Sequence, residues 1–431
     1  MSSFRTIIVA VCAFLMVILC QNAFAGDNGV IKLELPDAAA VGMGGAFTGE
    51  ADRPSAVYYN PAGIVQMDSI ETSVGLTLVQ PQIEYKSLTG DTSDMKRDNY
   101  IFPDFFVTTP VVKGKFYVGL GEDSNFGSGN DWAANSFSRY DTVKDSVENK
   151  DFMLVAAYKI NEQWSVAAGA TDDDSKFEHD QALYQGAGAD GDALFKANDN
   201  AWGFNLATMF KLNEQNQFGL DYKSPIHHTY DGSLYLNNLN HSNNDYQSIF
   251  GGTSFSTEAV QKFTMPQSVT LGYSLKPTNK WTVNFDLEWT DWSQYKQQTT
   301  FYPNVTNATQ LSVLGTGNPQ ARDWTSVWSE SLGVQYSVND RLRLRTGYEH
   351  HQTPISKGTF DTEFPDSDSN AITAGVGYDI TSRLTIDIAY VADFYQSRNI
   401  GNTVDNNLGA FLSGKYRAFV NVGTMSLTYK F

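Results

Sequence analysis

Cysteine is almost absent from this 431-residue chain, and the two that occur, Cys12 and Cys20, lie near its N-terminus. A positive residue, an apolar run over residues 7–19 and an A-x-A motif ending at Ala25 are typical of a secretory signal peptide. We therefore predict that residues 1–25 are removed on export. The mature protein would then contain no thiol, which excludes disulfide bonds and thiol chemistry.

Long hydrophobic runs are also lacking after residue 25, where Met153 to Tyr158 is typical of the longest. A membrane-spanning helix requires about twenty apolar residues. A lipid anchor on Cys20 is an alternative for the N-terminus, although lipidation favours a small residue at the position of Leu19. A soluble periplasmic protein and an outer-membrane barrel remain. The mean hydropathy of −0.33 does not separate them, because alternating barrel strands average out.

Positive charge is scarce, with 30 Lys and Arg against 48 Asp and Glu. A net charge of −18 would repel phosphate, so we expect no nucleic-acid partner. Motifs for nucleotides and for a serine nucleophile are also missing, so we predict no cofactor, no catalytic residue and no enzyme. A membrane-embedded hydrolase is the alternative, because residues that meet only in space cannot be seen in a sequence.

Histidine is equally rare, and the six that occur include the pairs His227-His228 and His350-His351, which we place in loops or at strand ends. Adjacent residues of a strand point to opposite faces, so neither pair predicts a metal site. The acidic stretches 172–174 and 364–368 are interpreted as solvated loops. Calcium binding by these loops is the alternative, because carboxylate oxygens suit that ion.

What the sequence does contain is alternation. Apolar residues from Trp281 to Trp289 alternate with polar ones, and the segments 384–390 and 424–431 repeat the pattern. A period of two predicts strands with one face toward lipid or a core, and aromatic residues cluster at the strand ends as in a membrane girdle. A β-sandwich would show the same alternation.

The connections favour a barrel, because short turns alternate with long polar segments as in outer-membrane barrels. Fourteen strands are predicted, an even number that closes an all-β antiparallel transmembrane barrel within residues 70–431. The predicted strands are 70–86, 99–110, 115–126, 151–160, 163–171, 200–211, 216–224, 265–276, 281–290, 326–337, 342–350, 370–379, 384–395 and 418–431. The long loops between them include 127–150, 172–199, 225–264 and 351–369.

Residues 26–69 are left over by this strand assignment and are rich in small residues, particularly between Ala38 and Gly49. Fourteen strands should enclose a lumen, whereas eight enclose only side chains. We therefore predict that residues 26–69 form a compact plug on the periplasmic side. The stretch 57–63, VYYNPAG, has the Pro and Gly of a tight turn and could be a mere connector. As part of a plug, its Tyr58 and Tyr59 would be packing anchors.

Several stretches, taken in order, resemble the FadL/TodX family of outer-membrane transporters of long-chain fatty acids and hydrophobic compounds. The matching stretches are 40–50 and 55–63 in the plug, then Phe102-Pro103 through Pro110, Gly119, Ser124-Asn125-Phe126-Gly127, Met265-Pro266, Trp289 to Ser293, Thr353-Pro354, Phe364-Pro365-Asp366 and the terminal Phe431. The resemblance covers nearly the whole mature chain and is weakest in the long loops.

This resemblance implies a barrel closed by an N-terminal hatch, through which hydrophobic molecules pass inward without energy input. It implies that a hatch motif, Asn60, Pro61 and Ala62, faces a kink at Ser124, Asn125, Phe126 and Gly127. A lateral opening at this kink would release cargo into outer-membrane lipid of a Gram-negative bacterium. One chain supplies enough strands for a monomer.

The resemblance does not determine which hydrophobic molecule is carried. Fatty-acid carriers place basic residues in the lumen, and the corresponding segment here reads Asp172-Asp173-Asp174-Ser175-Lys176. Lys176 could bind a carboxylate, but the aspartates would repel it. A fatty acid is the first choice and a neutral hydrocarbon or aromatic the second. The alternatives for function are a scaffold or shuttle in protein secretion and a general porin, and the residues of the pocket are not predicted.

Overall fold

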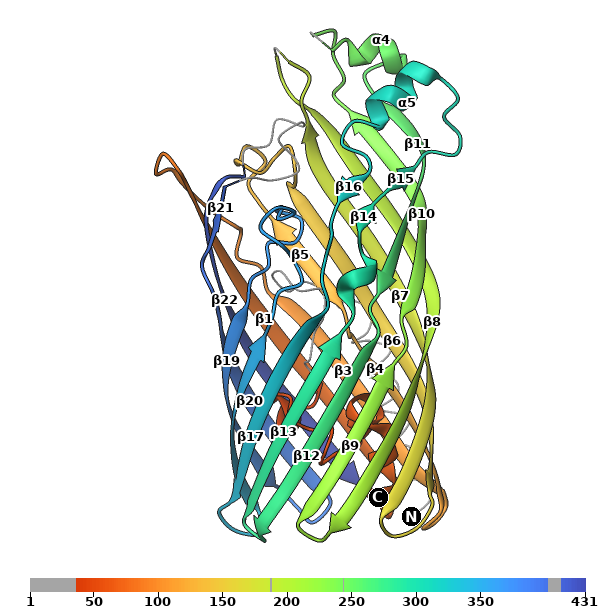
Figure 1. The fold of residues 1–431 in the computed structure, drawn as a ribbon, viewed down its shortest axis with the longest axis vertical. Coiled ribbons are helices and arrows are strands. Elements are labelled where there is room, and N and C mark those ends of the chain that lie inside the picture. Colours follow the sequence, from red (N-terminus) through yellow and green to blue (C-terminus); the bar gives the residue numbers. More distant parts are fainter. Residues whose placement is uncertain (1–35, 187, 243, 402–411) are drawn as a thin grey trace.

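The structure is a computed structural model that describes residues 36–186, 188–242, 244–401 and 412–431. Fourteen antiparallel strands form one closed barrel, as predicted (Figure 1). The ring consists, in order, of β1 (Glu71–Ser87), β3 (Tyr100–Val112), β4 (Phe116–Asp123), β6 (Lys144–Lys159), β7 (Trp164–Leu183), β8 (Gly191–Asn213), β9 (Asn216–Lys223), β12 (Ser268–Thr278), β13 (Trp281–Thr290), β17 (Val327–Ser337), β18 (Leu342–His351), β19 (Ser369–Asp379), β20 (Leu384–Tyr395) and β22 (Gly414–Lys430). Strand β22 closes the ring on β1, with Lys430 opposite Glu71.

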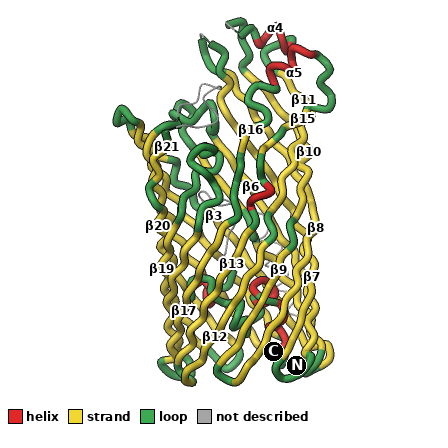
Figure 2. The backbone as a smooth tube through the Cα atoms, viewed as in Figure 1, coloured by secondary structure: helices red, strands yellow, loops and turns green. Residues whose placement is uncertain are grey.

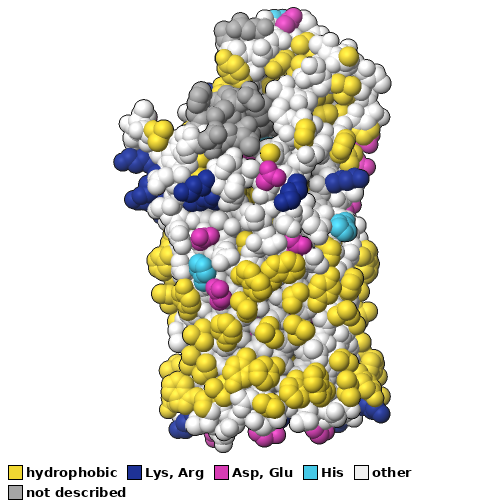
Figure 3. Space-filling model, in the orientation of Figure 1, with side chains coloured by type: hydrophobic (Ala, Val, Ile, Leu, Met, Phe, Trp, Pro, Cys, Tyr) yellow, Lys and Arg dark blue, Asp and Glu magenta, His cyan; other side chains and the backbone are white. Residues whose placement is uncertain are grey.

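The outer face of the barrel is apolar where the predicted strands alternate. Trp281, Phe285, Trp328 and Tyr390 are among the large side chains exposed on it. On the face shown in Figure 3, hydrophobic side chains form a band across the lower half of the molecule, with Lys and Arg along its lower rim and above it. No helix in the described part of the chain is long and apolar enough to cross a membrane.

Three of the predicted long loops are wrong in extent. The predicted loop 127–150 includes β5 (Gly127–Asp131) and the first residues of β6. Most of 172–199 continues β7 and β8, and most of 225–264 forms the hairpin of β10 (Ile226–Asn237) and β11 (Phe255–Met265). These strands rise above the apolar band, where the helices α4 (Tyr246–Phe250) and α5 (Ala308–Leu314) cap the outer end (Figure 2). Both faces of the extensions carry polar residues, so the alternation that identified the other strands is missing there.

The smaller elements belong to connections above the apolar band or to the third strand of the ring. They are β2 (Thr92–Asp94), β5 (Gly127–Asp131), η3 (Trp292–Gln294), β14 (Gln297–Gln298), β15 (Thr300–Phe301), β16 (Gln320–Ala321) and β21 (Arg398–Ile400). The acidic stretch 364–368, interpreted as a solvated loop, is buried from Phe364 to Ser367 instead. Asp173 of the other acidic stretch is also buried, since it points inward from β7. Both corrections have the same cause. Polar residues in the barrel extensions and in loops that fold into the lumen are buried, although their polarity in the sequence predicts exposure to water.

The hatch fills the lower lumen with short helices rather than strands. It contains α2 (Ala38–Val41), α3 (Ala56–Tyr59) and the 3-10 helix η2 (Pro61–Gln66), drawn in red inside the barrel (Figures 1 and 2). The predicted signal peptide and the hatch residues before Pro36 lie outside the described residues. Both tyrosines of the VYYNPAG stretch are buried anchors, as predicted, with their rings 4.8 Å apart in an edge-on contact.

Four wall glycines seat the hatch, and we call them the glycine belt: Gly219, Gly272, Gly333 and Gly347. A Cβ atom on Gly272 would overlap the backbone nitrogen of Gly49, and one on Gly333 would overlap the carbonyl of Met43. Because these neighbours are backbone atoms, no side-chain rotation could make room. The missing side chains therefore let the hatch backbone lie directly against the barrel wall.

Candidate functional site

Asn60, Pro61 and Ala62 lie at the base of the lumen and start η2. The Asn60 side chain accepts a hydrogen bond from Ala62 N–H at 3.1 Å and caps this helix. Its amide donates to the carbonyl oxygens of Thr48 and Thr208, at 3.0 and 3.3 Å, while Ser165 Oγ donates to the Ala62 carbonyl at 2.8 Å. The motif therefore joins two parts of the hatch to β7 and β8.

The hatch is tied to the wall on another side by a buried ion-pair network around Arg53. Its Nε lies 2.8 Å from Asp37 Oδ2, and its Nη2 lies 2.7 Å from Asp387 Oδ2. Arg345 donates to the other oxygen of Asp387 at 2.7 Å. On the β12–β13 side, Asp286 Oδ2 accepts the N–H groups of hatch residues 47 and 48. The hatch is thus fixed around its circumference.

We expect Arg53→Met to loosen the hatch without preventing barrel assembly. The fully buried Asp37 would lose its cation, and breaking a buried pair costs about 3–5 kcal/mol. Chymotrypsin digestion of the folded protein in detergent should then cleave within the hatch, after Phe47, Tyr58 or Tyr59. Arg341→Ala, at an exposed turn position, is the matched control and should resist cleavage as the wild type does. Equal protease resistance of Arg53→Met and the wild type would contradict this role.

The third strand is interrupted at the predicted kink. Strand β4 ends at Asp123 and β5 starts at Gly127. Asp123 lies opposite Asp151, whereas Gly127 lies opposite Glu148, so four steps on the third strand match three on β6. The extra residue is a β-bulge, and the burial of every residue from Gly127 to Asn130 indicates that β5 is displaced toward the lumen.

The kink leaves a window in the barrel wall. Strand β3 pairs with β4 only as far as Phe105 opposite Glu122, and in the described part of the chain no ladder joins β3 to β5. Residues 100–104 keep their pairing with β1 on the other side. Above the window, Lys96 N–H donates to the carbonyl of Asp131 at 2.8 Å. The window therefore has a hydrogen-bonded frame below and above it.

A cavity lies behind the window, directly above the hatch. Val57 and Tyr58 of α3, Asn125 and Phe126 of the kink, and Met153 of β6 belong to its lining. Its volume of about 40 Å³ has room for a few water molecules, so a larger ligand requires side chains to move. The hatch element beside the kink is thus α3, one turn before the Asn-Pro-Ala motif that the resemblance implied.

A second interruption borders the same cavity on its other side. Ser224 N–H and Oγ bind the backbone of Phe204, but the ladder between β8 and β10 resumes only at Asp231 opposite Asn198. Pro225 contributes to this break, since it has no N–H to donate. The sequence does not predict this feature, because its pattern over 225–264 indicates a loop rather than strands.

Buried carboxylates lie beside the residues that line the cavity. Asp104, Asp123 and Asp151 are buried, and each has a carboxylate oxygen without a hydrogen bond. Lys223 is the cation in the cavity lining, with its Nζ 3.8 Å from the centre of the Tyr58 ring. Lys176, which the sequence offered as a carboxylate partner, is exposed on the outer face of β7, so that interpretation is wrong. Phe177, its neighbour, points inward instead.

His179, predicted in a loop, lies within β7, whereas His227 and His228 lie at the start of β10, at a strand end as predicted. The prediction that a pair points to opposite faces is correct for the last two, since His227 is exposed and His228 buried. The two ring nitrogens of His228 face different carboxylates, Asp173 at 3.3 Å and Asp199 at 3.1 Å.

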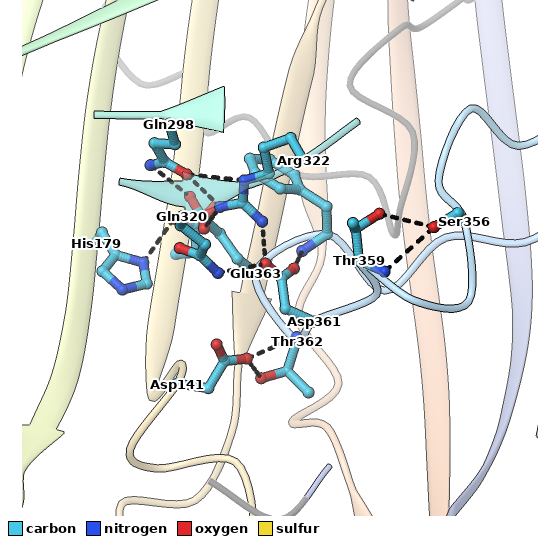
Figure 4. Close-up of polar contacts among 12 residues, drawn as sticks. Asp141, His179, Gln298, Gln320, Arg322, Ser356, Thr359, Asp361, Thr362 and Glu363 are labelled. Atoms are coloured by element: carbon cyan, nitrogen blue, oxygen red, sulfur yellow. Dashed lines mark hydrogen bonds and ion pairs between the residues drawn. The ribbon is translucent and has the colours of Figure 1, made fainter. Parts of the chain in front are cut away.

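Above the cavity, aromatic side chains from many strands and loops pack in the lumen. The buried cluster includes Phe126, Phe177, Phe195, Tyr230, Trp292, Tyr295, Trp324, Phe360 and Phe364. A second small cavity lies within it, lined by Phe177, Tyr230 and Phe364 among others. A buried group around Arg322 covers this region from the loops (Figure 4). There, burial raises the pKa of Asp361 to about 7, against the opposing effect of Arg322.

The fold and this site define a class: an outer-membrane β-barrel with a plug below an aromatic-lined lumen. A model of the outer membrane protein transport protein family (OMPP1/FadL/TodX) matches residues 21–431. The chain belongs to this family, whose members are transporters in the Gram-negative outer membrane. An open porin is not favoured, because aromatic residues fill the lumen, and neither is a secretion scaffold.

Individual relatives are distant but match over most of their length. The long-chain fatty acid transport protein of Escherichia coli K12 is 23% identical, over 82% of this chain and 86% of its own. The crystal structure of a Pseudomonas aeruginosa FadL homologue has a TM-score of 0.79 at 19% identity, covering 95% of this chain and all of that one. The Pseudomonas putida toluene transporter TodX has a TM-score of 0.71 at 16% identity, covering 94% of this chain and all of that one. These structural likenesses establish the fold.

Proposed function

We propose that this protein carries hydrophobic molecules passively from the outside to the cavity above the hatch and releases them sideways into the bilayer. The observation that carries this proposal is the juxtaposition of three features. The cavity is bounded by Tyr58 of the hatch and Phe126 of the kink, and the β3–β4 ladder stops beside it at Phe105. Asn60, Pro61 and Ala62 then hold the hatch, and Ser124 to Gly127 form the edge of the exit.

Lateral release follows from the hydrophobic effect. Each buried methylene contributes ~0.8 kcal/mol, so a ligand of about a dozen carbons gains roughly 10 kcal/mol on leaving water. Release into the aqueous periplasm would lose most of this free energy, whereas passage from an apolar cavity into hydrocarbon loses little. A barrel closed by a fixed hatch therefore needs an opening in its wall. Passive passage makes and breaks no covalent bond, so we assign the protein no enzymatic activity. One chain closes the barrel, and we propose a monomer.

The charges around the cavity favour uncharged cargo. Asp151 accepts the N–H of the lining residue Asn125 and lies opposite Asp123, so a fatty-acid carboxylate in the cavity would approach both aspartates. Lys223 is the cation in the lining that could oppose this repulsion. Like charges a few ångströms apart near a protein surface repel by a few kcal/mol. A neutral aromatic or alkane has no such cost. We therefore place neutral hydrophobic compounds before fatty acids as cargo.

Uptake into proteoliposomes tests this order. We expect toluene to enter at least about ten-fold faster than oleate, because a repulsion of about 1.4 kcal/mol or more slows the entry of oleate by that factor. Lys223→Met keeps the apolar stem beside Tyr58 and removes the charge. It should leave toluene uptake unchanged. If oleate enters as fast as toluene in the wild type and loses its uptake in Lys223→Met, the cargo is a fatty acid.

A further inference from the structure

We propose that Asp145, His179 and Glu363 form a binding site for a divalent transition-metal ion, Zn²⁺ in the first instance, at the outer end of the lumen. Asp145 of β6 and His179 of β7 are directly opposite in the antiparallel ladder, and both side chains face inward. Glu363 comes from the segment between β18 and β19. One ligand atom of each residue lies within 4.8 Å of those of the other two.

The spacing of these atoms suits a shared ion. His179 Nδ1 and Asp145 Oδ1 are 3.2 Å apart. Two ligands that each lie ~2.0–2.1 Å from a tetrahedral Zn²⁺ are separated by roughly 3.3 Å. The other ring nitrogen of His179 lies 3.5 Å from Gln181 Oε1. Metal-bound histidines commonly donate their second N–H to such an oxygen, which fixes the orientation of the ring.

An unused, buried acceptor points independently to a ligand. The Asp145 side chain is fully buried, and its Oδ2 has no hydrogen-bond partner. The carboxylates of Asp141, Asp361 and Glu363 are buried nearby, and Arg322 binds the last two (Figure 4). Buried carboxylates are normally paired or bound to metal, so the negative charge around Asp145 favours a cation.

The donor set selects the ion. An imidazole nitrogen with two carboxylates suits Zn²⁺ and its neighbours in the first transition row, whereas Ca²⁺ and Mg²⁺ prefer oxygen ligands alone. His228 also faces two carboxylates, but they bind opposite ring nitrogens and cannot converge on one ion. Convergence of three ligands from β6, β7 and a loop distinguishes the His179 site.

The position of the site gives the ion a structural effect. Glu363 precedes Phe364, which lines the second small cavity, the upper of the two, and packs edge-on against Trp324 with ring centres 5.5 Å apart. A bound ion would join this inward-folded segment to β6 and β7. It would thereby fix the aromatic cover over the upper cavity.

Zinc titration of the purified, chelator-treated protein tests the proposal. We expect one Zn²⁺ per chain by calorimetry and elemental analysis, with no comparable binding of Ca²⁺ or Mg²⁺. His179→Gln and Asp145→Asn should each weaken binding at least about 100-fold, because each removes a direct ligand. Co²⁺ should give a visible d–d absorption in the wild type that His179→Gln lacks. Heat-modifiable migration in gels confirms that each variant is a folded barrel.

His241→Ala is the matched control, because His241 forms a similar pair with Asp245 at 2.7 Å but is exposed in an outer loop. It should bind Zn²⁺ as the wild type does. Absence of stoichiometric binding in the wild type would overturn the site. So would binding that survives both His179→Gln and Asp145→Asn, or binding that is lost in His241→Ala. None of these outcomes depends on transport, so the proposed function is tested separately.

Discussion

Gly272→Val should open the barrel to polar solutes. The valine would overlap the backbone of Gly49, and neither the wall nor the hatch has a side chain there that could rotate away. Because the hatch is fixed on several sides, the clash should expel it from its seat rather than shift it slightly. Fourteen strands enclose a lumen, and without the hatch the aromatic cluster above it is the remaining barrier, so we expect polar solutes to enter about ten-fold faster or more.

Conductance in planar bilayers and antibiotic sensitivity of cells measure this change. Gly423→Val is the matched control, because Gly423 has no atom within 4 Å of the position that a Cβ would occupy. That variant should remain closed. If Gly272→Val assembles and conducts no more than the wild type, the glycine belt does not seat the hatch as described.

Deletion of Asn125 should abolish most uptake of hydrophobic cargo. The third strand has one residue more than β6 between the pairs Asp123–Asp151 and Gly127–Glu148. Removing one residue brings β4 and β5 into a single register, which removes the bulge and lets the third strand pair along β3. With the window closed, cargo could leave only into water, so uptake should fall at least about ten-fold.

Asn125→Ala is the control for this deletion, since it changes the same side chain and keeps the extra residue. It should transport at a rate near that of the wild type. Both proteins can be compared in proteoliposomes after their assembly has been checked by heat-modifiable migration. Wild-type uptake by the deletion variant would show that cargo does not pass the kink.

The sequence predicted the barrel because lipid imposes a strict pattern on the strands that cross it. Apolar and polar residues alternate from Trp281 to Trp289 because one face of the strand meets hydrocarbon. The predicted bounds of such strands lie within a few residues of those in the structure. The extensions of β7 and β8 were missed because water surrounds their outer face. There, Asp172 and Asp174 point out while Asp173 points in, so no hydropathy pattern remains.

The candidate site was predictable only in part, for a related reason. The kink and the hatch motif carry local signals, glycine and proline, that single residues reveal. The lining of the cavity depends on strand register instead. Lys176 was chosen from its position in the sequence, although the inward direction of Phe177 places it on the outer face. The pairing of Asp145 with His179 likewise depends on where β6 begins. The predicted loop 127–150 leaves the first residues of β6 out of the strand.

Reversible closure of the window is the most direct test of lateral release. Phe105 lies opposite Glu122 where the β3–β4 ladder stops. Three residues further along each strand, the same register places Phe102 and Asn125 on opposite sides of the window. The chain has no cysteine after Cys20, so Phe102→Cys with Asn125→Cys supplies a single reactive pair. Uptake of toluene should stop when a short, reducible cross-linker joins the two thiols and return when the linker is reduced. Undiminished uptake through the cross-linked barrel would contradict the account.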